Sequence, residues 1–209
     1  MELMISANEV MIDGEPVFMV PVVGQEIRVA GIASPPNSHS GELGHRHLFV
    51  GTDGCCSGNI YTLTRHGWKE KFGLTSTLGM DIGVRDIVPV VHRDGVIRFE
   101  DRPCLLAAGY SCNGRGVRLI SPVAPTKPLE IVGNDEWNEL VPSMSLVRPA
   151  LRVGPTYPEG SVHLDIYWGD AWSGRWYREI YGTTDLTKRL EAHGIDVGQE
   201  NPFWVVARR

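Results

Sequence analysis

The sequence predicts a mainly β fold, a single-domain barrel or sandwich of antiparallel hairpins with one C-terminal helix packed against it. The chain has 24 glycines and 14 prolines among its 209 residues, and this abundance without a regular period is typical of folds with many tight turns. Four Asp-Gly or Asn-Gly pairs also lie between apolar or β-branched stretches, and such pairs supply the positive φ angles of two-residue hairpin turns. These pairs begin at Asp13, Asp53, Asp94 and Asn113.

The stretches between the turn signals are rich in Val, Ile, Leu and aromatic residues, which favours strands. Alternation is clearest where Val162, Leu164 and Ile166 share one face of an extended chain. The expected strands cover residues 9–12, 16–23, 26–33, 47–52, 59–64, 82–91, 96–100, 104–110, 116–120, 145–153, 161–168, 175–181 and 203–207.

The C-terminal helix is expected over residues 184–193. Thr184 is placed to cap its N-terminus, because a threonine hydroxyl accepts a hydrogen bond from the first turn. Leu186 and Leu190 lie four residues apart and so share a face that can pack on the sheets. Gly194 fits the glycine that ends many helices.

The chain has the length of one domain, and we expect residues 1–209 to form a single β-rich unit. Residues 122–128 contain three prolines, which a central strand does not tolerate, so this segment marks the candidate position of an internal division. Residues 135–140 form a second, shorter candidate helix.

The charge balance limits the classes of partner. The formal net charge is −5, whereas a dedicated nucleic-acid binder usually carries a basic balance, so nucleic acid is a disfavoured partner. The apolar runs are much shorter than a membrane span, and the N-terminus lacks the basic and apolar regions of a signal peptide. We therefore expect a cytoplasmic protein without membrane attachment, whose partner is a small molecule or another protein.

The four cysteines are too few for a disulfide scaffold in a chain of this length, and we expect free thiols. Cys55 and Cys56 are adjacent and poorly placed to pair with each other. Cys104 and Cys112 flank a predicted hairpin, which would allow them to approach each other.

Histidine is concentrated in residues 39–66, where four of the seven histidines lie. His45 and His47 are two residues apart, so both imidazoles project from one face of a strand and can bind the same zinc or ferrous ion. Such a site needs at least one further ligand. The candidates in this segment are His39, Glu42, Asp53, Cys55 and His66.

The His45-Arg46-His47 sequence resembles the first motif of the cupin barrels over a short stretch. The resemblance implies that the two imidazoles bind a metal ion. Where that motif carries a glutamate a few positions later, this chain has Gly51, Thr52 and Asp53.

Two other kinds of chemistry fit the same segment. The order of His45 or His47, Asn59 and His66 is similar to that of the His-Asn-His metal nucleases, in which one histidine activates water. Alternatively, Cys55 or Cys56 acts as a nucleophile with one of these histidines as its base.

A second candidate site lies in the aromatic segment from residue 157 to 181. Glycines on both sides of Trp172 predict a loop between two strands with this indole near its tip, beside Asp170 and Arg175. An exposed indole gives a large contact area at low entropic cost, so the loop is a candidate for recognising a ligand or a protein partner.

The sequence therefore leads to two functional hypotheses and leaves enzymatic activity open. The first is a metal or small-molecule site, containing zinc or iron, around His45 and His47. The second is a non-enzymatic interaction protein, such as an inhibitor or immunity-type factor that binds a protein partner. Stoichiometric metal bound by the two histidines distinguishes the first from the second.

Overall fold

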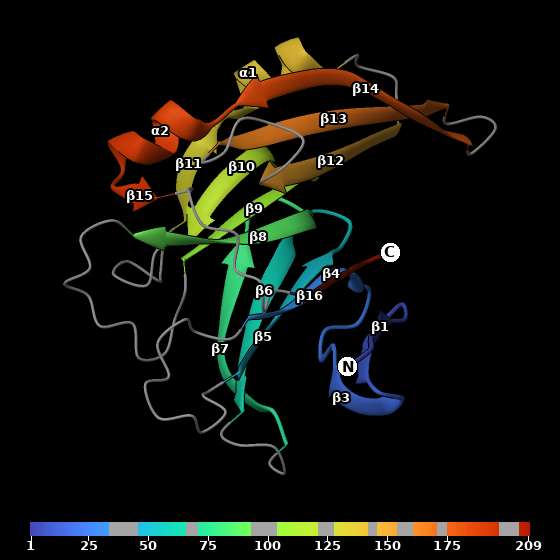
Figure 1. Ribbon diagram of the computed structural model, residues 1–209. Coiled ribbons are helices and arrows are strands. Elements are labelled where there is room, and N and C mark those ends of the chain that lie inside the picture. Colours follow the sequence, from blue (N-terminus) through green and yellow to red (C-terminus); the bar gives the residue numbers. More distant parts are fainter. Residues whose placement is uncertain are drawn as a thin grey trace.

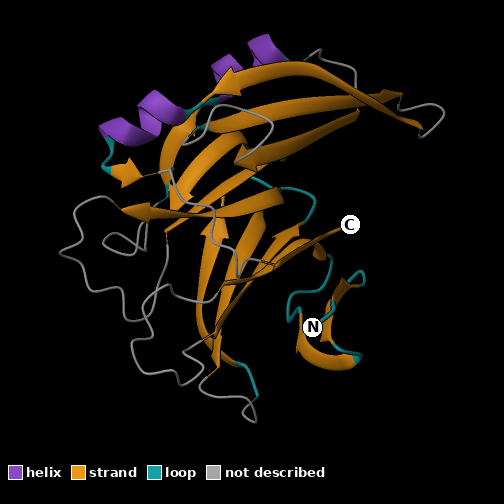
Figure 2. Cartoon of the chain, in the orientation of Figure 1, coloured by secondary structure: helices purple, strands orange, loops and turns teal. Residues whose placement is uncertain are grey.

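The computed structural model describes residues 1–33, 46–65, 71–92, 104–120, 128–141, 146–153, 161–170, 175–196 and 205–209 (Figure 1). The mainly β prediction is confirmed, because these residues form four antiparallel sheets and two short helices. Figure 2 shows both helices on the side of the molecule remote from the N-terminal strands.

Two of the sheets are built largely from the first part of the chain. The N-terminal sheet has the order β1-β2-β3, formed by Leu3–Ile5, Glu9–Ile12 and Glu15–Met19. The first five-stranded sheet has the order β16-β4-β5-β6-β7. Its strands are Val205–Arg208, Glu26–Ala33, Arg46–Asp53, Gly58–Arg65 and Gly73–Met80.

The other two sheets come from the later part. The second five-stranded sheet has the order β11-β10-β9-β8-β15, formed by Leu129–Val132, Arg115–Ile120, Cys104–Tyr110, Val84–His92 and Ile195–Asp196. The C-terminal sheet has the order β12-β13-β14, formed by Leu146–Val153, Val162–Asp170 and Arg175–Asp185. The helices are α1, Asn134–Leu140, and α2, Thr187–Ala192.

The four sheets stack in layers around three apolar cores. One core joins Val10 of the N-terminal sheet to Leu48 and Val50 on one face of β5. Phe49, on the opposite face of β5, packs in the core between the two five-stranded sheets. The third core lies between the second five-stranded sheet and the C-terminal sheet with both helices, and Leu164 belongs to it. Because β5 is covered on both faces, its apolar residues run continuously instead of alternating.

The architecture is a stack of sheets, and no closed barrel is found among the described strands. The predicted alternation at 162–166 is confirmed, since Val162, Leu164 and Ile166 all enter the third core. The predicted division at 122–128 falls almost wholly in residues that the structure does not describe.

Three local predictions need correction. Thr184 does not cap α2: β14 continues to Asp185, whose carboxylate accepts the Thr187 N–H at 2.8 Å. The strand expected over 16–23 ends at Met19. Of the described Asp-Gly and Asn-Gly pairs, only Asp13-Gly14 makes a two-residue hairpin turn, with φ of 52° and 81°.

Two further local predictions, for Gly194 and for a helix at residues 135–140, are confirmed. Gly194 has φ of 72°, as a helix-ending glycine requires. The candidate helix at 135–140 exists as α1, so the C-terminal helix is not the only one among the described residues.

A buried carboxylate joins three of the sheets. Asp86 lies in β8, is 1% exposed, and accepts hydrogen bonds from the backbone N–H groups of Ile87 and Leu151 at 2.9 and 2.8 Å. Its Oδ1 also lies 2.9 Å from Nε of Arg208 in β16. One side chain on β8 therefore fixes β12 and β16.

We expect Asp86→Ala to lower the free energy of unfolding by about 3–5 kcal/mol, because it removes one partner of a buried ion pair. Arg209→Met is the matched control. It removes an exposed arginine that binds Glu26 at 3.1 Å, and such surface pairs contribute about 0–1 kcal/mol. Urea unfolding of both variants measures the difference.

Arg208→Met tests the same joint through its pH dependence. Burial raises the pKa of Asp86, so its ionised form is less favourable in the folded chain than in the unfolded one. In this variant the ionised Asp86, which is the form present above its pKa, no longer has Arg208 as its counter-ion. The destabilisation should thus be largest near neutral pH and disappear as the pH falls and Asp86 becomes protonated. A loss of stability that is independent of pH contradicts this role.

Candidate functional site

His47 is a buried residue of β5 with a hydrogen-bond partner. It is 1% exposed, its Nδ1 lies 3.2 Å from Oγ1 of Thr64 on the neighbouring strand, and its ring stacks on Phe49. The hydroxyl offsets the cost of burying one ring nitrogen.

Asp53 lies at the other end of β5, six residues from His47 and so about 20 Å away along the strand. Its two carboxylate oxygens bind different arginines, Oδ1 with Arg28 at 3.0 Å and Oδ2 with Arg85. The structure does not bring His47 and Asp53 together. Cys55 follows Asp53, so it too lies at the end of β5 remote from His47.

Several predicted site residues fall outside the described part of the chain. They are His39, Glu42, His45, His66 and Trp172. Asp170 and Arg175 are paired at the ends of β13 and β14, and the loop predicted around Trp172 lies outside the described residues. Within the described ranges, no group of three His, Cys, Asp or Glu side chains is arranged to hold a metal ion.

The three exposed cysteines among the described residues gather instead where four turns meet, at the joint of the two five-stranded sheets. We call this region the turn cluster, and it comprises residues 22–25, 54–57, 81–83 and 111–114. Asn113 donates from Nδ2 to the Cys56 carbonyl at 2.7 Å, and Ser111 donates from Oγ to the Asp81 carbonyl at 2.9 Å. These bonds fix three of the turns to one another.

Three thiols from two of these turns lie together. Cys55 and Cys56 belong to the β5–β6 turn, and their sulfur atoms are 3.6 Å apart. Cys112, in the β9–β10 turn, donates from its Sγ to the Cys55 carbonyl at 3.3 Å, and its thiol lies close enough to Cys56 to change the pKa of that residue. All three are exposed free thiols, whereas Cys104 is a buried one.

The thiols influence each other's protonation. Hydrogen bonding with Cys112, and next with Cys55, raises the pKa of the Cys56 thiol to about 12. Since the thiolate is the reactive form, the raised pKa slows attack by Cys56 while Cys112 remains a thiol beside it.

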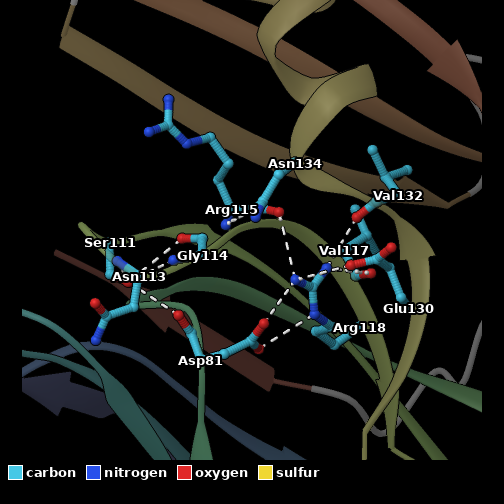
Figure 3. A network of polar contacts seen from close by, with 10 residues as sticks. All are labelled: Asp81, Ser111, Asn113, Gly114, Arg115, Val117, Arg118, Glu130, Val132 and Asn134. Carbon is cyan, nitrogen blue, oxygen red and sulfur yellow. Dashed lines mark hydrogen bonds and ion pairs between the residues drawn. The ribbon is translucent and has the colours of Figure 1, made fainter.

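An arginine binds the 81–83 turn of the turn cluster (Figure 3). Arg118 of β10 has a side chain only 4% exposed, and it binds the Asp81 carboxylate through Nε at 3.2 Å and Nη2 at 2.8 Å. Its Nη1 donates to the Val132 carbonyl at 2.9 Å, and its Nη2 lies 3.2 Å from Glu130. The bidentate contact fixes the 81–83 turn over the second five-stranded sheet.

Glycines allow the turns to approach so closely. A Cβ on Gly83 would lie 2.7 Å from the Tyr110 carbonyl and 2.9 Å from Cβ of Asp53. Gly83 and Tyr110 also exchange backbone hydrogen bonds at 3.2 and 3.1 Å. A larger residue at position 83 would separate the two sheets at this point.

The sequence indicates Cys55 as a candidate site residue but does not indicate Cys112 as its neighbour. The approach of Cys112 to Cys104 that a hairpin would allow does not occur, because β9 extends from Cys104 to Tyr110 and separates the two cysteines by its full length. Each of the two turns carries cysteine and glycine directly after a strand. This was the available signal, but which turns meet depends on how the sheets pack.

Comparison with protein-family models, curated proteins and solved structures found no match to this chain. No helix in the described residues is long and apolar enough to cross a membrane.

The mutual effect of the thiols is testable in a Cys55→Ser background. There, adding Cys112→Ala should lower the pKa of Cys56, because the largest cause of its elevation is removed. Alkylation of Cys56 by iodoacetamide near pH 8 should become faster, as measured by mass spectrometry of the modified peptide. Adding Cys104→Ala instead is the control and should leave the rate unchanged. An unaltered pH profile without Cys112 shows that the two thiols do not interact.

Proposed function

We propose that this chain is a thiol–disulfide exchange protein, with Cys56 and Cys112 as its reversible disulfide pair and Cys55 as a third thiol beside them. The observation that carries the proposal is the meeting of three exposed free thiols from two separate turns.

The positions of the thiols support this pairing. Cys55 and Cys56 are neighbours in sequence and poorly placed to bond with each other, whereas Cys112 comes from another turn, donates from its sulfur to the Cys55 carbonyl and raises the pKa of the adjacent Cys56. Asn113 and Ser111 hold the two turns in register, so the pair need not be brought together from a distance.

The reaction takes two steps. A thiolate at Cys112 attacks one sulfur of a substrate disulfide, forms a mixed disulfide and expels the first substrate thiol, which takes up a proton. Cys56 then loses its proton and attacks the Cys112 sulfur, forms the Cys56–Cys112 bond and expels the second substrate thiol. In sum, two protein thiols are oxidised and one substrate disulfide is reduced, with two electrons transferred.

The raised pKa of Cys56 suits this order of events. While Cys112 is a free thiol, Cys56 keeps its proton and does not compete for the substrate. Once Cys112 is bound in the mixed disulfide, its hydrogen bond to Cys56 is lost and the Cys56 pKa falls towards the ordinary value. The second thiol then becomes reactive when the first has reacted.

The His-based metal site remains a separate prediction. His47 is buried beside Thr64, and its expected partners His39, His45 and His66 lie outside the described residues. Zinc or iron that remains with purified protein, and is lost in a His45→Ala/His47→Ala variant, would support that alternative.

Oxidation with glutathione disulfide tests the proposed function. We expect one intramolecular disulfide, found by mass spectrometry as the loss of two hydrogen atoms, linking the peptides that contain Cys56 and Cys112. Cys112→Ser should abolish it. Cys104→Ser, the matched control, should preserve it because Cys104 is 1% exposed.

The proposal fails if the wild-type protein acquires only glutathione adducts. It also fails if the link persists without Cys112.

A further inference from the structure

An apolar turn stands next to the thiols. Residues Val22 to Gln25 connect the end of the N-terminal sheet to β4, and the Gln25 N–H lies 3.4 Å from the Val22 carbonyl. Gly24 has φ of 85°, as the third residue of a type II turn requires. Val23 thus occupies the second position, at the tip.

The side chain of Gln25 anchors this turn to the first five-stranded sheet. Its Oε1 accepts hydrogen bonds from Oγ1 of Thr52 at 2.9 Å and from Nδ2 of Asn59 at 2.7 Å. These residues lie on β5 and β6 beside the turn that carries Cys55 and Cys56. The tip is therefore held in a defined position relative to the thiols.

The turn also packs against the residue that precedes Cys55. A Cβ on Gly54 would lie 3.1 Å from Cγ of Gln25 and 3.5 Å from the Gly24 carbonyl, and Gly54 directly precedes Cys55. Val23 is 100% exposed and Val22 43% exposed. Apolar side chains presented on a fixed turn next to a reactive group are suited to contact a partner, because their burial is favourable and little entropy is lost.

We infer that the turn formed by Val22 and Val23 is a docking surface for the substrate, which is a cysteine-containing protein segment with an apolar side chain close to the cysteine. The inference rests on the proposed exchange function and names its substrate class. An extended peptide covers about 3.3–3.6 Å per residue, so an apolar residue two or three positions from the reacting cysteine lies about 7–11 Å from it, the span over which it could contact a neighbouring turn.

Glutathione disulfide fits this surface less well. Its residues offer carboxylates and short polar groups rather than an apolar side chain, so it reacts at the thiols without using Val22 and Val23. A protein segment gains the additional apolar contact. The exchange rate with an apolar peptide should consequently depend on the turn, and the rate with glutathione disulfide should not.

The experiment uses two hexapeptides that carry one cysteine as a mixed disulfide with 2-nitro-5-thiobenzoate and differ only in Leu or Ser three positions after the cysteine. Release of the coloured thiol gives the rate with each peptide. We expect the full-length protein to react about fivefold to tenfold faster with the Leu peptide, since burying part of a leucine side chain is worth about 1 kcal/mol. In Val22→Ser/Val23→Ser the two rates should become equal.

Leu74→Ser is the matched control. Leu74 is 55% exposed but pairs with Leu63 on β6, five residues along that strand from Gly58 at the thiol end. This variant should keep the preference for the Leu peptide. Both exposed-site variants should react with glutathione disulfide at the wild-type rate.

The outcomes separate the two proposals. Equal rates for both peptides with the wild-type protein, or a preference that survives Val22→Ser/Val23→Ser, overturn the docking surface and leave the exchange function intact. No Cys112-dependent reaction with any disulfide overturns both. If oxidised protein alone forms an interchain disulfide dimer that Val22→Ser/Val23→Ser abolishes, the turn binds a second copy of this chain, and the substrate assignment is wrong.

Discussion

The buried carboxylate of Asp86 is the interaction on which the stacking of the sheets depends. β8 belongs to the second five-stranded sheet, yet this side chain binds a backbone N–H of β12 and a guanidinium of β16. Apolar cores hold layers together without fixing their relative position, because burial is non-directional. The two directional bonds from this carboxylate to other sheets, one to Leu151 and one to Arg208, supply that position. Burial raises the pKa of Asp86. Keeping this carboxylate ionised therefore costs free energy, which its hydrogen-bond and ion-pair partners must offset.

The same strand organises the turn cluster. Arg85 precedes Asp86 and binds Asp53 at the end of β5, while its guanidinium lies over the Tyr110 ring at 4.8 Å. The residues just before β8 form the 81–83 turn that Arg118 holds. The ends of β5 and β9, and with them the two cysteine-bearing turns, are thus fixed by charges on or next to one strand. Three thiols meet because the sheets are joined close by, and no disulfide is needed to bring them together.

Composition and turn signals were sufficient to predict a mainly β fold, because glycine-bounded apolar stretches have few other solutions. Residue types were less informative where a run of strand-forming residues also contains residues that favour a turn. Val20 to Val23 is a β-branched run, yet Pro21 and a glycine with positive φ turn it into a loop. The candidate site shows a further limit. The spacing of His45 and His47 is visible in the sequence, whereas the meeting of Cys112 with Cys55 spans 57 residues and depends on the packing of two sheets.

The pairing of β16 with β4 has a consequence for how the chain folds. Arg209 binds Glu26, which lies 183 residues earlier, and β16 completes one edge of the first five-stranded sheet. Contacts between such distant residues are slow to form, because the chain must lose the conformational entropy of closing the long loop before the contacts stabilise it. Until residues 205–208 arrive, β4 presents an unpaired edge whose backbone groups can pair with another molecule. During synthesis, this edge is where we expect the incomplete chain to be most prone to aggregate and to need a chaperone.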